Sequence, residues 1–345
     1  MLISRSDKPI LTLDQPWERG GTACAVGAFL EDDQRSIRLY YLVYFNDDMR
    51  RNVLCLARTA DLRTWEKPDC GDGTNVVMRS CGNTMGWGIF MPCRILQGCD
   101  DPDVNRQWKM LYWERPDAKR PPGYCLATSP DGLRWTPLFD QPVITGANDA
   151  GSMIDARDDA PSPVENASML IYQQTWKYNP QLPRDRDNLT AMHRMISIWR
   201  ASSIHGSWTG PIAILEPDRL DPPDVQFYWL TPFRAGRGYA GFLHTHHTAE
   251  QIMDAQLVTS LDGWTWRREN DRRPVLPLGQ KGRFDCGMIM SWAAPVAWNG
   301  RVLVFYNASA TVHDGKPRYP NDPLPAPAEG IGLAEFDQAL LKGPE

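Results

Sequence analysis

One short pattern occurs four times along the chain and restricts its fold more than any other feature. In each copy, small or apolar residues lead to a Ser or Thr, then to a turn, and then to a Trp. The copies are CLARTADLRTWEKP (residues 55–68), CLATSPDGLRWTPL (125–138), WRASSIHGSWTGP (199–211) and LVTSLDGWTWRRE (257–269). Such repetition is typical of a fold assembled from copies of one supersecondary unit.

Strand-like runs precede each copy of the pattern. The longer runs are IRLYYLVYF (residues 37–45), WKMLYWE (108–114), SMLIYQQTW (168–176) and YAGFLHTH (239–246). Aromatic and β-branched residues favour strands, and a shorter apolar run lies upstream of each of these segments. Each unit therefore reads as four strands joined by turns, and four antiparallel strands make one blade of a β-propeller.

The unit length predicts an all-β fold, a single five-bladed propeller over residues 1–345 with four antiparallel strands in each blade. The expected blades are residues 17–69, 85–139, 148–214, 224–271 and 284–336. The last unit lacks a terminal Trp strand, so we expect an N-terminal strand, residues 9–13, to complete it and leave no free edge. A two-sheet sandwich with a second domain is the alternative, but it does not explain the regular unit.

Charge and hydropathy exclude several classes of partner. The chain has 37 Lys and Arg against 42 Asp and Glu, with no block of like charge, so we expect neither a nucleic-acid partner nor a polybasic membrane surface. The longest nearly apolar stretch, residues 288–298, is shorter than a membrane helix. With no apolar signal segment at its start, the protein is expected to be cytoplasmic. Its oligomeric state stays open.

The cysteines are expected to be free thiols. There are eight of them, with no C-x-x-C pair, and several lie in apolar strand-like runs. A chain of this size can build a large core without disulfides. Neither a phosphate-binding Gly loop nor a Gly-x-Ser-x-Gly motif is found, so nucleotide-dependent and serine-hydrolase chemistry lack their usual support.

Three aspartates stand at matching places in successive units, just before the expected innermost strand. They are Asp149, Asp224 and Asp285. Residues at equivalent places in a ring of units converge on its axis, so we predict that these carboxylates form a catalytic site. The alternative is that each Asp caps a turn at a strand entrance.

Glu18 stands at the corresponding place in the first unit and is the candidate general acid. A carboxyl group beside Trp17, away from bulk water, would keep its proton to higher pH. A solvated loop residue is the alternative. Asp155 and Glu114 are further candidates, but they fall within strands, where a shift of one residue reverses the side-chain direction.

Aromatic, histidine and arginine side chains supply the expected substrate-binding residues. Flat rings pack against the apolar faces of sugars, and polar groups bind the hydroxyls. The candidates are Trp17, Trp87, Tyr228, Trp292, His246, His313 and Arg273. The four repeated tryptophans are assigned to packing instead. No metal ligand is assigned, because the His244 to His247 segment has no Cys or carboxylate at a zinc-site spacing nearby.

The chain resembles the five-bladed propeller glycoside hydrolases of families 43, 32 and 117 and their bacterial relatives. The likeness rests on the Ser-x-Asp-Gly-x-x-Trp turns, residues 108–112 and 224–241, GQKGRFDCGMIMSWAAPV (279–296) and VFYNASATVHDG (304–315), and it spans about residues 17–336. It implies a pair of Asp or Glu carboxylates in an axial funnel. The chain lacks Trp-Met-Asn-Asp-Pro-Asn, Arg-Asp-Pro and Glu-Cys, so the resemblance assigns no nucleophile.

These features predict a glycoside hydrolase that acts on a short saccharide or glycoside. A glycoside phosphorylase or transglycosylase on the same fold is one alternative, and a propeller that binds carbohydrate without cleaving it is another. No cofactor is expected beyond a structural calcium ion that the many oxygen ligands could hold. The sugar, the linkage and the stereochemical course stay open.

Overall fold

The computed structural model describes residues 1–83, 89–98, 101–146, 148–156, 168–180 and 187–344. Within them the chain forms 23 strands and short 3-10 turns, and no α-helix. The all-β prediction is confirmed. No helix of the described residues is long and apolar enough to cross a membrane.

The first three sheets follow the order of the chain. The first sheet contains β2 (Thr22–Leu30), β3 (Ile37–Tyr44), β4 (Val53–Thr59) and β5 (Val76–Arg79). The second contains β6 (Met91–Leu96), β7 (Trp108–Glu114), β8 (Gly123–Ser129), β9 (Thr136–Pro137) and β10 (Ile144–Thr145). The third contains β11 (Gly151–Asp155), β12 (Met169–Tyr178), β13 (Met192–Ala201) and β14 (Thr209–Leu215). Neighbouring strands in all three are antiparallel.

A larger sheet contains the rest of the strands in two groups. One group is β15 (Val225–Ala235), β16 (Gly238–His247), β17 (Ile252–Ser260), β18 (Arg267–Arg268) and β19 (Pro274–Leu276). The other is β20 (Met288–Met290), β21 (Val296–Trp298), β22 (Arg301–Ser309), β23 (Glu329–Phe336) and β1 (Leu2–Arg5). A single parallel pair, Met253 with Met288, joins the two groups.

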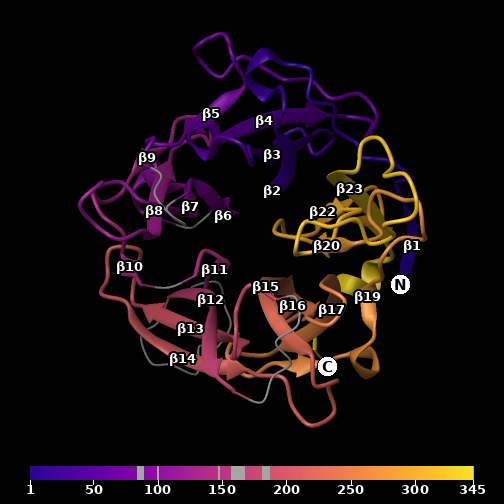
Figure 1. Ribbon diagram of the computed structural model, residues 1–345. Helices are drawn as coiled ribbons and strands as arrows, with labels where there is room; N and C mark the ends of the chain where they lie inside the picture. The colour runs from indigo at the N-terminus through magenta and orange to yellow at the C-terminus, as the bar shows by residue number, and fades with distance from the viewer. Residues whose placement is uncertain (84–88, 99–100, 147, 157–167, 181–186, 345) are drawn as a thin grey trace.

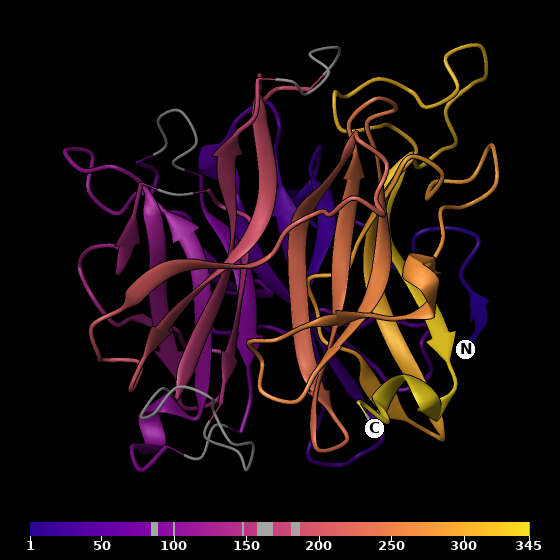
Figure 2. The ribbon, with the colours of Figure 1, turned by 90° about the horizontal axis from the view of Figure 1, so that it is seen from below.

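The strand groups surround a common centre. In Figure 1, β2, β6, β11, β15 and β20 lie nearest the middle, and the later strands of each group lie farther out. Figure 2, turned by 90°, shows the long strands running between two ends of the molecule, where the loops gather. The arrangement is that of a β-propeller. The number of blades stays a prediction.

Two of the four repeated Trp turns connect adjacent strand groups through hydrogen bonds. In the second copy, Asp131 accepts hydrogen bonds from the backbone N–H groups of Leu133 and Arg134, and the Trp135 indole donates to the Gly132 carbonyl at 2.9 Å. The hydroxyl of Tyr40, from the preceding sheet, donates to the same carbonyl at 3.0 Å. The motif therefore folds a local turn and also fixes the contact between neighbouring groups.

The fourth copy repeats this arrangement. Trp266 donates to the Gly263 carbonyl at 3.0 Å, and Tyr172 of β12 donates to it at 2.6 Å. The assignment of these tryptophans to packing therefore agrees with their contacts.

The N-terminal segment pairs with the last group, although not through the predicted residues. β1 is antiparallel to β23, with Leu2 opposite Phe336 and Arg5 opposite Ala334. Residues 9–13 form no strand, and the Ile10 N–H donates to the Ile331 carbonyl. The prediction of residues 9–13 as the pairing strand was wrong, because Pro9 has no N–H to give to a ladder, whereas every residue of β1 has one.

The described cysteines are free thiols: Cys24, Cys55, Cys70, Cys81, Cys93, Cys125 and Cys286. Most of them are buried or partly buried within the sheets. Cys99 lies outside the described residues. Within the described chain, packing therefore takes the place of disulfides, as the size of the core allows.

Candidate active site

Asp149 lies directly before the innermost strand β11, as expected. The backbone N–H of the next residue, Ala150, donates to Asn148, which shapes the entrance of the strand. Burial raises the pKa of the Asp149 carboxyl to about 6. Because burial disfavours the charged form, this group can carry a proton near neutral pH and give it to a bound molecule.

Two tyrosines lie in the electrostatic field of Asp149. Burial and the charge of Asp149 raise the pKa of Tyr44, at the end of β3, to about 12. The same two causes raise the pKa of Tyr228 on β15. Both phenols therefore keep their protons and can donate hydrogen bonds at neutral pH.

His313 connects Tyr228 to a turn on the neighbouring strand pair. Its Nε2 lies 3.1 Å from the Tyr228 hydroxyl, and its Nδ1 lies 3.2 Å from Oε1 of Gln251. The Gln251 amide nitrogen donates to the Thr248 carbonyl, so its oxygen faces the imidazole. Nδ1 therefore carries the proton and Nε2 accepts from the phenol.

His246 is fully buried beside this pair. Its ring centroid lies 4.6 Å from that of His313 and 5.8 Å from that of Tyr228. Neither ring nitrogen makes a hydrogen bond of standard geometry with a described residue. Burial lowers the pKa of His246 well below its usual value, and burial also lowers that of His313 to about 4. Both imidazoles are neutral at neutral pH.

Arg194 on β13 holds a second carboxylate next to these histidines. Its guanidinium donates to both oxygens of Asp187, at 2.8 and 3.0 Å, and is only 1% exposed. Nη1 also donates to Gln226 and Nη2 to Asn188. This two-pronged pairing orients Asp187 and engages the guanidinium fully.

Three of these side chains lie close enough together to bind one metal ion. One ligand atom from each of Asp187, His246 and His313 lies within 4.8 Å of the others. The cluster also contains Tyr228, whose electrostatic neighbours include both Asp149 and Asp187. Tyr228 therefore links the two carboxyl groups. We use the name Tyr228 cluster for the following set: Tyr228, Tyr44, Asp149, Asp187, Arg194, His246 and His313.

An exposed aromatic side chain stands near the cluster. Gln174 of β12 donates from its side chain to the Tyr228 carbonyl and from its backbone to the Ala150 carbonyl. Its side-chain oxygen accepts the indole N–H of Trp176, whose side chain is 39% exposed. Trp176 thus offers a fixed flat surface of the kind that packs against sugars.

The other two predicted aspartates have different partners. Asp224 caps the turn after β16, where its carbonyl accepts from the Thr248 N–H and its carboxylate from the Ala249 N–H. Asp285 is fully buried, and its carboxylate lies 3.3 Å from Arg5 on the outermost strand and 3.3 Å from Arg283. Among the three, only Asp149 is an electrostatic neighbour of Tyr44 and Tyr228, and the convergence of all three on one centre stays a prediction.

The first-unit candidates lie in the short turn η1 (Pro16–Glu18). Glu18 is fully buried and accepts hydrogen bonds from Tyr41 at 2.5 Å and from Lys67 at 2.6 Å. The indole of Trp17 donates to Asn75 at 3.0 Å. Both side chains thus anchor the N-terminal segment to β3 and to the loop before β5.

The remaining predicted residues are separated in the structure. Trp292 is buried and stacks on Trp229, with ring centroids 5.1 Å apart, so its contacts are those of a core residue. Arg273 is exposed at the end of the turn η4 (Asn270–Arg272). Trp87 lies outside the described residues. Tyr228, His246 and His313 are therefore the predicted binding residues that the fold brings together.

Asp155 and Glu114, the further candidates, also have other partners. A carboxylate oxygen of Asp155 lies 3.8 Å from the buried amine of Lys109. Glu114 accepts the Cys81 N–H at 2.7 Å, and burial raises the pKa of its carboxyl.

Sequence reasoning missed Asp187, Arg194, Tyr44, Gln251 and Trp176. One signal could have found some of them. Tyr44, Trp176 and His246 each lie at or near the carboxyl end of the second strand of a unit. Antiparallel pairing places that end beside the start of the innermost strand, where Asp149 lies.

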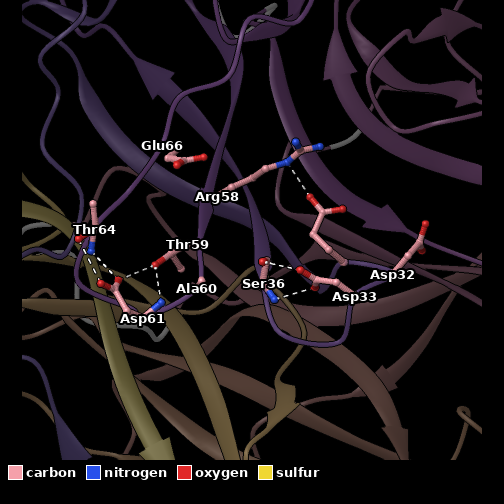
Figure 3. Close-up of a pocket in the computed structure, with 10 residues that line it drawn as sticks. Asp32, Asp33, Ser36, Arg58, Thr59, Ala60, Asp61, Thr64 and Glu66 are labelled. Carbon is pink, nitrogen blue, oxygen red and sulfur yellow. Dashed lines mark hydrogen bonds and ion pairs between the residues drawn. The ribbon is translucent and has the colours of Figure 1, made fainter.

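A cavity of about 550 Å³ lies at the opposite end of the first sheet (Figure 3). It is lined by the ends of β2 and β4 and the loops that follow them, and it contains none of the predicted site residues. Several of its charged groups are already paired, since Glu31 lies 2.7 Å from Arg58 and Asp61 accepts backbone N–H groups of its own turn. We therefore place the candidate site at the Tyr228 cluster.

No protein-family model and no curated protein matches the chain. Solved structures do match over nearly the whole length. One named as a glycoside hydrolase has 13% identity and a TM-score of 0.61, covering 99% of this chain and 93% of that one. An endo-arabinase from Bacteroides thetaiotaomicron has 13% identity and a TM-score of 0.54, covering 94% and 98%.

A third match comes from a study of mannoside phosphorylases of family GH130 that describes glycoside hydrolases targeting β-1,2 mannosidic linkages. It has 11% identity and a TM-score of 0.59, covering 92% of this chain and 85% of that one. At such identities the likeness establishes the fold, and the chain has the all-β propeller fold of these glycoside-acting enzymes.

Proposed function

We propose that this protein hydrolyses a glycosidic bond at the Tyr228 cluster, with Asp149 as the proton donor. The observation that carries the proposal is the raised pKa of this carboxyl group at the entrance of an innermost strand. Glycosidases need one carboxyl group that keeps its proton until the leaving oxygen takes it. Asp149 has the environment that such a group requires.

We assign the second catalytic role, activation of the attacking water, to Asp187. Arg194 orients this carboxylate through two hydrogen bonds, and Tyr228 lies in the field of both carboxyl groups. Glycosidases pair one carboxyl group for acid work with a second one that activates water. We therefore propose that the attacking water is held beside Asp187.

A hydrolase is favoured over a phosphorylase by the charges of the cluster. Binding of inorganic phosphate needs cationic donors that are free to pair with it. The guanidinium of Arg194 is already engaged by Asp187, Gln226 and Asn188, and His246 and His313 are neutral. Water is thus the better acceptor for the glycosyl group at this site.

The expected substrate is a short saccharide or glycoside. The hydroxyls of Tyr44 and Tyr228 can bind sugar hydroxyl groups, and Trp176 offers an aromatic surface. We propose cytoplasmic action on such saccharides.

The test is a screen of the purified protein against aryl glycosides and short oligosaccharides, with and without inorganic phosphate. Asp149→Asn should lower kcat by about 10²- to 10⁴-fold on any substrate found, the usual contribution of a general acid. Asp32→Asn, which removes an exposed carboxylate far from the cluster, is the matched control and should keep full activity. Asp224→Asn and Asp285→Asn test the catalytic roles predicted from the sequence.

Three results would contradict the proposal. Full turnover by Asp149→Asn would show that Asp149 is not the proton donor. A requirement for phosphate would favour the phosphorylase. Binding of saccharides by the wild-type chain without any cleavage would favour a carbohydrate-binding propeller.

A further inference from the structure

The strongest unexplained feature of the Tyr228 cluster is His246. Its side chain is fully buried, and neither ring nitrogen makes a hydrogen bond of standard geometry with a described residue, although the Gln251 side chain interacts with the ring. A buried polar group without a partner costs about 1–3 kcal/mol of stability. His246 has two such nitrogens and packs against a second histidine. This arrangement indicates a ligand that would bind the nitrogen lone pair of the imidazole.

We propose that His246, His313 and Asp187 bind one divalent transition-metal ion of the zinc class. One ligand atom from each lies within 4.8 Å of the others, so small side-chain movements bring all three to a common ion. Imidazole nitrogens select metals such as zinc, iron and nickel, whereas calcium prefers a shell of oxygens. Two histidines and one carboxylate also leave coordination positions open for water or substrate.

The surroundings fit ligation by these groups. Arg194 takes one lone-pair position on each oxygen of Asp187, and a carboxylate has about four, so Asp187 can bind a metal while Arg194 orients it. The amide oxygen of Gln251 lies 3.2 Å from Nδ1 of His313, so the ligand atom would be Nε2, which would exchange its hydrogen bond from Tyr228 for the ion. Such an outer partner fixes the tautomer and orientation of a metal-binding histidine.

The cluster places no uncompensated positive charge beside the proposed ion. Asp187 offsets the charge of Arg194, and the two histidines are uncharged ligands. Open positions on the ion would hold the attacking water and make it more acidic, a role that rests on the proposed function, whereas the metal site itself does not.

The first experiment measures metal uptake without any glycoside. The full-length chain is stripped with a chelator and titrated with Zn²⁺ by calorimetry, and Co²⁺ is used as a spectroscopic probe. We expect one ion per chain and visible Co²⁺ absorption bands typical of protein ligation. His246→Gln and His313→Gln should each weaken Zn²⁺ binding at least tenfold.

His247→Gln is the matched control. His247 is adjacent in sequence but pairs with Asp254 at 3.1 Å and belongs to no ligand set among the described residues. This variant should bind Zn²⁺ like the wild type. Circular dichroism of each variant shows whether the fold is retained, and the Co²⁺ spectrum of the wild-type chain tests ligation without any mutation.

The site is overturned if the wild-type chain takes up no stoichiometric Zn²⁺ or Co²⁺, if it takes up only Ca²⁺, or if a folded His246→Gln variant binds Zn²⁺ as tightly as the wild type. Different results would contradict the proposed function. A chain that binds zinc through His246 and cleaves no glycoside supports the site and contradicts the hydrolase, whereas a glycosidase that takes up no metal does the reverse.

Discussion

Carboxyl groups inside this protein differ by what surrounds them. Asp285 has two arginines and the Tyr306 hydroxyl within 3.3 Å, so its charge is compensated inside the fold. The pKa of Asp149 is instead governed by burial, which raises it, and to a smaller extent by backbone N–H groups, which lower it. One residue type thus serves to hold the chain together in one place and to carry a proton in another.

The pKa of Asp149 predicts the pH dependence of activity. A general acid works only while protonated, so kcat/KM should be highest below about pH 6 and fall about tenfold per pH unit above it. A pH profile on an aryl glycoside with a poor leaving group measures this limb. A profile that rises through pH 6 to 8 would make Asp149 a base instead.

The same residue predicts a change in stability. Because the folded pKa lies above the unfolded value, the folded state binds more protons between about pH 4 and 6 and loses stability as pH rises through that range. Asp149→Asn should therefore be more stable than the wild type at pH 7.5, by about 1–2 kcal/mol, with the difference vanishing near pH 4. Urea unfolding at both pH values measures it, and an equal effect at both would exclude a titration origin.

Asp285→Asn should have the opposite effect on stability. It leaves the positive charges of Arg5 and Arg283 without their buried partner, and breaking such a pair costs about 3–5 kcal/mol. Chemical denaturation measures the loss. A stable variant that has lost only turnover would instead support the catalytic role predicted for Asp285 from the sequence.

Strand β1 is an element with two functions. It covers the outer edge of β23, and it supplies Arg5 to Asp285. Deletion of Leu2–Arg5 should therefore lower the melting temperature of the whole protein and expose a strand edge that promotes aggregation. Thermal unfolding with light scattering tests this, and Ile3→Thr, a change at an exposed position of β1, is the control that keeps the backbone ladder.

The turn motif was predictable because its causes are local. Asp131, Gly132 and Trp135 form their turn through hydrogen bonds within five residues, so the sequence pattern contains the whole structure of the turn. The pairing of β1 was not predictable in the same way. Its partner is more than 300 residues away, and the choice between residues 2–5 and 9–13 depends on contacts that no local pattern contains.

At the scale of the whole molecule, the site combines residues from several strand groups. Asp149 precedes β11, Tyr228 lies on β15, and His313 follows β22. The repeat predicted that the strand entrances of the units would meet, and Asp149 and Tyr228 are candidates from that prediction that belong to the candidate site. It could not predict Asp187 or Arg194, because loop conformation and side-chain direction on a strand are set by neighbours from other units.

Closure through β1 also constrains how the protein is made. Residues 2–5 are synthesised more than 300 residues before their partner strand β23. Until β23 has been made, β1 has no partner and Arg5 is not held beside Asp285. Nascent chains that stop before residue 329 would therefore lack this pairing and be susceptible to proteases.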